Sequence, residues 1–222
     1  MSDPGLPYRD RREAGRVLAR ALQHYRGRAG LLVLALPRGG VAVGFEVAHA
    51  LEAPLDVFVV RKLGFPGHEE YAMGAIASGG VRVMNPLPGL DVTPDAVARV
   101  VGREETELAR RERLYRGDRP RIDVRGRTVI VVDDGLATGA TMRAAVMALR
   151  QQGPGQLVVA VPVGAPETCR SLRTLADELV CPAMPEPFRA VGLWYREFPQ
   201  ATDEEVHELL NEARREHAAA LH

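Results

Sequence analysis

One stretch of the sequence decides the fold: Val129-Ile130-Val131-Val132-Asp133-Asp134-Gly135-Leu136-Ala137-Thr138-Gly139-Ala140-Thr141. Its first four residues are uniformly apolar, which is typical of a strand buried on both faces of a parallel sheet. Two adjacent carboxylates end this strand, and a turn rich in glycine and threonine opens a helix. Open α/β sheets bind their ligands at the carboxyl edge of the strands. The stretch therefore predicts an α/β fold and the position of a ligand site.

The rest of the chain repeats this alternation of strands and helices. The hydrophobic patterns predict strands at residues 31–36, 55–60, 129–132, 157–161 and 178–181, and helices at 9–25, 41–51, 93–115, 141–151, 167–175 and 202–221. Helical crossovers between such strands build a parallel sheet. We expect a single doubly wound, Rossmann-like α/β domain over residues 1–222 with flanking helices and a core at about 9–182.

Two peripheral segments interrupt the alternation. Residues 61–85 are rich in glycine, and a long excursion of this kind is typical of a lid or a binding loop. Within this predicted flexible lid, residues 75–77 and 81–84 have the spacing of a hairpin. Residues 183–222 begin with clustered prolines and continue through the most aromatic part of the chain, at 188–198, into the last helix. They predict a small hood over the sheet.

The composition is that of an ordinary globular protein. Of the 222 residues, 46% are hydrophobic and 26% charged, which excludes disordered and collagen-like classes. Basic and acidic residues balance at 29 each, so no overall field attracts nucleic acid or a membrane. No apolar run approaches the ~18 residues of a membrane span, and the start lacks the pattern of a signal peptide. Because Cys169 and Cys181 form no disulfide framework, we expect a cytoplasmic protein.

A single lysine stands among the basic residues. Every other residue of the 29 is arginine, and the exception is Lys62. Lysine presents a compact, strongly hydrated ammonium, whereas arginine presents a planar fork. Lys62 is either the last position left by a drift towards arginine or a position where chemistry requires an ammonium.

The loop after the acid pair has the features of a phosphate site. Backbone N–H groups of residues 137–141 would point into one concavity at a helix N-terminus, beside two threonine hydroxyls. No lysine follows the second glycine, which disfavours a Walker A loop. A helix N-cap is the simpler alternative, but it explains one acid or one threonine rather than the whole string. A ribose 5-phosphate carries both the diol and the phosphate that the string would satisfy.

The whole string resembles the thirteen-residue signature that binds phosphoribosyl pyrophosphate (PRPP) in type I phosphoribosyltransferases. The resemblance implies that Asp133 and Asp134 hold the ribose 2′- and 3′-hydroxyls and take part in catalysis. It also implies that residues 137–141 bind the 5′-phosphate. The remaining residues of the implied PRPP site are Gly135 and Leu136.

Two further motifs follow the order of the family. The turn Pro37-Arg38-Gly39-Gly40 resembles its pyrophosphate loop, in which glycines let backbone amides approach an anion and an arginine chelates it; an ordinary strand-to-helix turn is the alternative. Arg61 and Lys62 resemble the basic pair before the family's mobile lid. The resemblance therefore implies that Arg38, Gly39, Gly40, Arg61 and Lys62 bind pyrophosphate, the last two as catalytic residues.

The acceptor is expected to lie under the hood. Phe188, Val191 and Trp194 lie in a segment similar to the purine-stacking tail of hypoxanthine-guanine enzymes, and aromatic faces suit a flat base. The alternative is that the aromatic residues of this segment only pin the tail to the core. Ala137 stands where the 6-oxopurine enzymes have an aspartate, which disfavours hypoxanthine and guanine as acceptors.

The resemblance implies transfer of a 5-phosphoribosyl group from PRPP to a nitrogenous base with release of pyrophosphate, as in nucleotide salvage. Mg²⁺ would arrive as a complex with PRPP, and the sequence predicts no metal site of the protein's own. The alternative is a non-catalytic PRPP sensor on the same fold. PRPP synthesis would need tandem halves of the fold. Many family members are dimers, so a homodimer is compatible with the resemblance.

Overall fold

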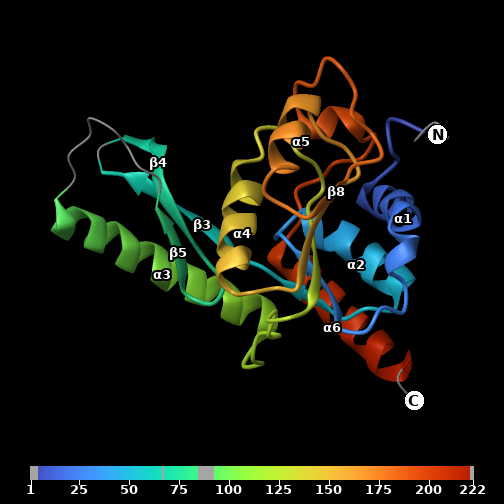
Figure 1. Cartoon of the computed structure of the whole chain (residues 1–222), viewed down its shortest axis with the longest axis horizontal. Helices are drawn as coiled ribbons and strands as arrows, with labels where there is room; N and C mark the ends of the chain where they lie inside the picture. The colour runs from blue at the N-terminus through green and yellow to red at the C-terminus, as the bar shows by residue number, and fades with distance from the viewer. Residues whose placement is uncertain (1–4, 67, 85–92, 221–222) are drawn as a thin grey trace.

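A computed structural model describes residues 5–66, 68–84 and 93–220, with only the backbone at 69–71 and 220. Gly67 and Asn85 of the expected lid, and Leu221 at the expected end of the last helix, lie outside the described residues. A central sheet has helices on both of its faces, and a second sheet extends away from it beside a long helix (Figure 1).

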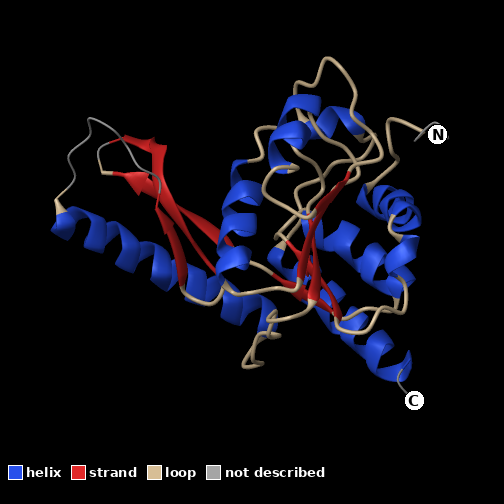
Figure 2. Ribbon diagram, viewed as in Figure 1, coloured by secondary structure: helices blue, strands red, loops and turns tan. Residues whose placement is uncertain are grey.

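The central sheet is parallel throughout, with the strand order β2-β1-β6-β7-β8. Figure 2 distinguishes the strands, in red, from the helices around them, in blue. Its strands are β1 (Leu31–Ala35), β2 (Leu55–Val57), β6 (Thr128–Val132), β7 (Gln156–Ala160) and β8 (Glu178–Val180). Every residue of β1 and β6 is buried. Their continuous apolar sequence follows because both faces of a parallel sheet are covered. The doubly wound α/β fold predicted from the sequence is confirmed.

Alternate residues of β6 pack into two cores, one on each face of the sheet. Ile130 and Val132 pack with α1 (Arg11–Ala21), the short helix η1 (Gln23–Tyr25) and α2 (Gly40–Leu51). Val129 and Val131 pack with α4 (Ala140–Gln151) and α5 (Pro166–Leu172). The last helix of this set ends three residues earlier than predicted, where the Thr174 hydroxyl donates to the Ser171 carbonyl at 2.8 Å.

The segment after β2 differs most from the sequence-based expectation. Instead of one strand over 55–60 followed by a lid loop, β2 ends at Val57 and the chain enters an antiparallel sheet. This sheet consists of β3 (Val60–Phe65), β4 (His68–Ala77) and β5 (Val81–Met84). The predicted hairpin is confirmed, with Ala75 opposite Val83. The described part of the expected lid is thus mainly sheet.

Ser78 stabilises the point where the chain changes from one sheet to the other. Its hydroxyl accepts from the backbone N–H of Val59 at 2.9 Å, and its own N–H donates to the carbonyl of Val59 at 2.8 Å. Ser78 is buried, so these bonds satisfy backbone groups that leave the parallel ladder. A sequence pattern of apolar residues at 55–60 does not reveal this change of partner.

Two long helices complete the fold. The first is α3 (Pro94–Arg116), capped as predicted by Thr93, and it covers one face of the second sheet while α4 packs on the other. The second is α6 (Asp203–Ala220), which packs on α2 and α3 and begins with a capping box between Thr202 and Glu205. In the described ranges, no helix combines the length and the apolar composition that crossing a bilayer requires.

Gly102 offers a test of α3. A Cβ at this exposed position would meet nothing within 4 Å, so alanine removes the entropic disadvantage of glycine without a clash. We expect Gly102→Ala to raise the free energy of unfolding by about 0.5–1 kcal/mol in urea denaturation. The matched control is Gly44→Ala in α2, where the new Cβ would approach the Cβ of Ala35 at 3.0 Å and offset the gain. Equal stabilisation by both substitutions would contradict this account of the packing.

Candidate active site

The predicted acid pair lies at the carboxyl edge of the central sheet. Asp133 and Asp134 follow the last residue of β6 directly, and the chain reaches α4 at Ala140. The backbone N–H of Asp134 donates to Oδ1 of Asp133 at 2.9 Å. Strand, acid pair, turn and helix therefore follow one another as the sequence predicts.

The turn before α4 is open to an anion. Gly139 caps the helix with φ of 69°, and a Cβ there would come within 2.5 Å of the Thr168 side chain, so both the backbone conformation and the space require glycine. The Thr168 hydroxyl donates to the carbonyl of Ala137 at 2.6 Å. Residues 137, 138, 140 and 141 are exposed, and the first N–H groups of a helix lack intrahelical partners. The turn therefore has the properties of a phosphate-binding loop.

The glycine turn after β1 touches the acid pair. A Cβ on Gly39 would lie 2.0 Å from Oδ2 of Asp134, and one on Gly40 would lie 2.8 Å from the carbonyl oxygen of Val132. Gly39 has φ of −57°, which any residue can adopt, so the requirement for glycine is one of space. The peptide bond between Pro37 and Arg38 is cis. The predicted pyrophosphate loop and the predicted ribose-binding acids are thus in direct contact.

Arg38 points from this turn towards α6. Its guanidinium lies 4.0 Å from the carboxylate of Asp203, and its side chain is 35% exposed. With Arg11 it lines a cavity of about 390 Å³ between α1, α2 and α6. The glycines of the predicted pyrophosphate loop therefore lie on the acid pair, and its arginine lies at the neighbouring cavity.

Arg11 is a site residue that the sequence did not single out. Its Nε donates to Oδ2 of Asp134 at 2.8 Å, and its Nη1 donates to the carbonyl of Pro199 at 2.7 Å. Its guanidinium also stacks on the ring of Phe198, 3.8 Å from the centroid. Because other arginines surround it in a polar helical stretch, no local sequence signal distinguishes Arg11.

Burial dominates the electrostatics of the acid pair. Desolvation raises the pKa of Asp133 well above its usual range, and the neighbouring Asp134 raises it further. Desolvation also raises the pKa of Asp134, although the hydrogen bond and the charge of Arg11 oppose the rise. Burial therefore disfavours negative charge on this pair, while a ligand that donates hydroxyl hydrogens favours the carboxylates.

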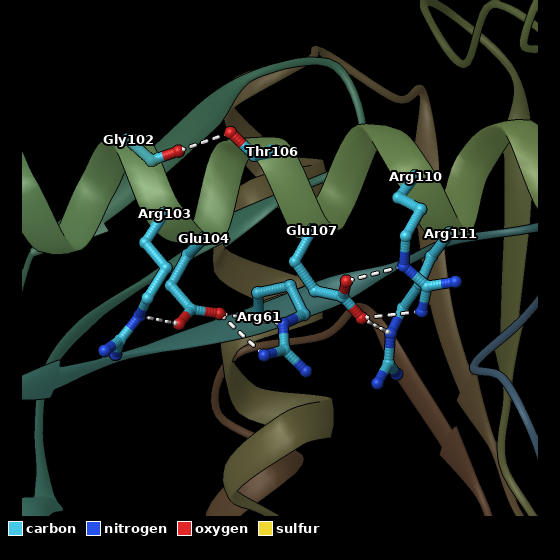
Figure 3. A network of polar contacts seen from close by, with 8 residues as sticks. All are labelled: Arg61, Gly102, Arg103, Glu104, Thr106, Glu107, Arg110 and Arg111. Carbon is cyan, nitrogen blue, oxygen red and sulfur yellow. Dashed lines mark hydrogen bonds and ion pairs between the residues drawn. The ribbon is translucent and has the colours of Figure 1, made fainter.

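The predicted basic pair is divided between two faces of the second sheet, because neighbouring strand residues point to opposite sides. Arg61 donates to Oε2 of Glu104 on α3 from Nε at 2.9 Å and from Nη2 at 2.7 Å. Figure 3 shows Arg61 and Arg103 converging on Glu104, which is 8% exposed, as Arg110 and Arg111 converge on Glu107. Lys62 is exposed on the other face. The structure thus gives Arg61 a buried partner and leaves the ammonium of Lys62 accessible.

The three predicted acceptor residues lie together in the hood. A Cβ on Gly135 would lie 2.6 Å from Cγ1 of Val191, so the hood rests directly on the signature loop at the short helix η2 (Val191–Trp194). The rings of Phe188 and Trp194 stack with their centroids 6.0 Å apart. Among the described residues, the buried Nε1 of Trp194 has no hydrogen-bond partner.

Other aromatic residues of the hood anchor it. The Tyr195 hydroxyl donates to the backbone carbonyl of Asp134 at 2.5 Å, and burial raises the pKa of this hydroxyl. Phe198 contacts Tyr195 and carries the guanidinium of Arg11. The segment therefore contains both anchoring aromatic residues and an aromatic pair with an unsatisfied donor.

The buried acid pair makes stability depend on pH. A group whose folded pKa is raised above its unfolded value contributes stability below the unfolded pKa and loses it as pH rises through the folded pKa. Asparagine at position 133 cannot ionise, yet its amide oxygen still accepts from the N–H of Asp134. We expect Asp133→Asn to be more stable than the wild type at pH 7 and to lose this advantage near pH 4, as measured by urea denaturation. Parallel profiles for the two proteins would contradict the raised pKa.

Comparisons with known proteins point to the same family. A sequence model of the phosphoribosyl transferase domain matches residues 10–191. A Mycobacterium tuberculosis protein, named as a candidate phosphoribosyl transferase, is 47% identical over 213 residues, which is 95% of this chain and 48% of that protein. A ribose-phosphate pyrophosphokinase of Methanopyrus kandleri is 32% identical over 180 residues, which is 69% of this chain and 62% of that protein. The chain thus spans about half the length of the mycobacterial relative.

A solved structure agrees with the fold. The crystal structure of a Thermus thermophilus protein is 44% identical in sequence and superposes with a TM-score of 0.82, over 92% of this chain and 98% of that one. The match to the family model covers the glycine turn, the acid pair and the turn before α4. The chain belongs to the phosphoribosyl transferase domain family.

Proposed function

We propose that this chain binds PRPP with its Mg²⁺ and transfers the 5-phosphoribosyl group to a nitrogenous base with release of pyrophosphate. The observation that carries the proposal is the contact between the glycine turn after β1 and the acid pair after β6. This contact supports a site in which the glycine turn binds an anion and the two carboxylates accept hydroxyl hydrogens, with the loop before α4 next to them along the same edge of the sheet. PRPP carries the complementary groups in that order: pyrophosphate, ribose diol and 5′-phosphate.

Each part of the substrate then has a binding element. Asp133 and Asp134 accept hydrogen bonds from the ribose hydroxyls, and the N–H groups at the start of α4, with the hydroxyls of Thr138 and Thr141, bind the 5′-phosphate. The backbone at Gly39 and Gly40 approaches the pyrophosphate. The ribose-phosphate pyrophosphokinase relative carries a name that refers to ribose phosphate, which supports this part of the assignment.

The transfer requires positioning and charge compensation more than covalent chemistry. The bond from C1′ to a pyrophosphate oxygen breaks, its electron pair leaves with the pyrophosphate, and a nitrogen lone pair of the acceptor forms the new bond. Cations near the departing oxygen lower the barrier. Mg²⁺ bound to the substrate would screen the same charge. In this chain, Arg38 and Lys62 are the cations with accessible side chains in the two predicted pyrophosphate segments.

Arg61 contributes to the proposed site by holding β3 on α3 through Glu104, rather than by offering a free charge to the substrate. Its guanidinium is held by Glu104, so contact with pyrophosphate would require this buried pair to separate. With the pair intact, Arg61 fixes β3 against α3 and thereby the neighbouring Lys62. The hood is the proposed acceptor subsite, where a base would stack beside the aromatic pair of Phe188 and Trp194.

Binding and turnover are tested in one series. We expect the wild type to bind PRPP with Mg²⁺ in calorimetry and to release pyrophosphate with one member of a panel of free purines and pyrimidines. We expect the double variant Asp133→Asn with Asp134→Asn to abolish PRPP binding and pyrophosphate release. The two carboxylates that accept hydrogen bonds from the ribose hydroxyls would then have lost their charge. Arg12→Gln, at a surface ion pair with Glu46, is the matched control and is expected to behave as the wild type. Retained PRPP affinity in the double variant would refute the site.

The same series separates an enzyme from a sensor. Saturable PRPP binding without pyrophosphate release across the panel would favour the non-catalytic sensor. Absence of PRPP binding by the wild type would refute the proposed function.

Two substitutions test Lys62: one removes its charge, and the other keeps the charge but changes the shape of the group. We expect Lys62→Ala to lower kcat by about 10²-fold with a smaller change in KM, since the loss of one group that stabilises developing charge has this effect. Lys62→Arg keeps the charge but not the compact ammonium and is expected to recover only part of the rate. Steady-state pyrophosphate release measures both variants. Unchanged kcat in Lys62→Ala would show that the lone lysine has no catalytic part.

A further inference from the structure

An arginine outside the signature forms an ion pair with its second aspartate. Arg11 donates from Nε to Oδ2 of Asp134 at 2.8 Å, and the two side chains are only 12% and 15% exposed. The same oxygen faces Gly39, where a Cβ would fall at 2.0 Å. One oxygen of the Asp134 carboxylate is therefore enclosed by the glycine turn on one side and by the guanidinium on the other.

Attachment of α1 to the domain does not require this contact. Neighbouring arginines of α1, Arg12 and Arg16, already pair with Glu46 of α2 at 3.2 and 3.3 Å, with side chains that are 45% exposed. The apolar face of α1 packs on α2, and its Leu18 and Ala19 are buried in the core on that side of the sheet. These contacts are sufficient to hold α1 on the domain. The ion pair of Arg11 therefore serves Asp134 rather than the attachment of the helix.

The remaining contacts of Arg11 fix its orientation. Its Nη1 donates to the carbonyl of Pro199, and its planar face lies on Phe198. Stacking and a fork of donors are properties of arginine that lysine lacks. The guanidinium is thus held from the hood side while its Nε is directed at Asp134.

Of the groups described around the Asp134 carboxylate, the guanidinium of Arg11 is the one that compensates its negative charge. Asp133 adds a second desolvated carboxyl, the Tyr195 hydroxyl donates to the backbone carbonyl of Asp134, Gly39 has no side chain, and Arg38 of the same turn points towards Asp203. Arg11 opposes the rise that burial causes in the pKa of Asp134. A protonated carboxyl would have one fewer acceptor for a ribose hydroxyl.

We propose that Arg11 is a positioning residue of the ribose site, which fixes Oδ2 of Asp134 and compensates its charge so that Oδ1 accepts a hydrogen bond from a ribose hydroxyl. The inference rests on the proposed function. It adds a requirement that lies outside the signature, on a different helix and near the start of the described chain.

The test is PRPP affinity as a function of pH. We expect Arg11→Gln to weaken binding of PRPP with Mg²⁺ at pH 7 by about 10- to 100-fold, the range typical for loss of a residue that orients a binding group. The affinity of this variant should recover as pH rises from 6 to 9, because Asp134 must then lose its proton without help from a cation. Ionisation of PRPP itself affects all proteins equally, so differences from the wild type report on the site.

Three further variants and one titration complete the design. Arg11→Lys keeps the charge and is expected to restore most of the pH profile. Arg12→Gln, the adjacent control, should match the wild type. Should Arg11→Gln fail to fold, Phe198→Leu keeps the charge of Arg11 but removes the ring under the guanidinium, together with its contact to Tyr195, and should shift affinity in the same direction by a smaller factor. A carbon-13 titration of the Asp134 carboxyl without ligand should show a higher midpoint in Arg11→Gln than in the wild type.

The outcomes separate this inference from the proposed function. If the wild type binds PRPP and Arg11→Gln binds it with the same affinity and pH profile, the role of Arg11 is overturned while the proposed function stands. If the wild type does not bind PRPP, the proposed function fails, and the carboxyl titration still decides whether Arg11 controls Asp134. An unchanged midpoint in that titration overturns the inference.

Discussion

The close approach of Gly39 to the Asp134 carboxylate is the constraint on which the site depends. It arises from the sheet: β1 and β6 are parallel neighbours with Ala35 opposite Val132, so their carboxyl ends reach the same level. The bond from the N–H of Leu36 to the carbonyl of Val132, at 2.9 Å, extends the ladder one step further. Two turns that are distant in the chain therefore begin side by side, and only glycine leaves room for the acid between them.

This arrangement places two carboxyl groups where burial disfavours their charge. The fold tolerates the pair because one end of it is compensated by Arg11 and the backbone of its loop is bonded to the hood through Tyr195. Functional sites commonly keep such locally unfavourable groups, since the same groups bind substrate once it replaces water. The hood thus has a second role, because its Phe198 and Pro199 hold the guanidinium of Arg11 next to the acid pair.

The second sheet changes the interpretation of the glycine-rich segment. Such a composition favours a loop, yet the described residues pair into three strands whose two faces are covered by α3 and α4. Glu104 of α3 accepts hydrogen bonds from Arg61 of β3 and so joins the helix to the second sheet. Glu107 pairs with Arg110 and Arg111 along the surface of the same helix. Lys62 therefore projects from a strand with a defined register, opposite Ala75, rather than from an unstructured lid.

The sequence by itself determined the parallel sheet and the position of the acid pair at its carboxyl edge. Buried strands such as β6 carry a continuous apolar pattern, and the Asp133–Thr141 string has a local geometry that follows from its own residues. Tertiary structure alone decided what those residues touch. Asp134 pairs with one of many arginines, and Arg61 pairs with Glu104. After β2 the chain leaves the parallel sheet, where Ser78 accepts a hydrogen bond from the N–H of Val59. Such contacts join segments far apart in the chain, and no local pattern encodes which charge meets which.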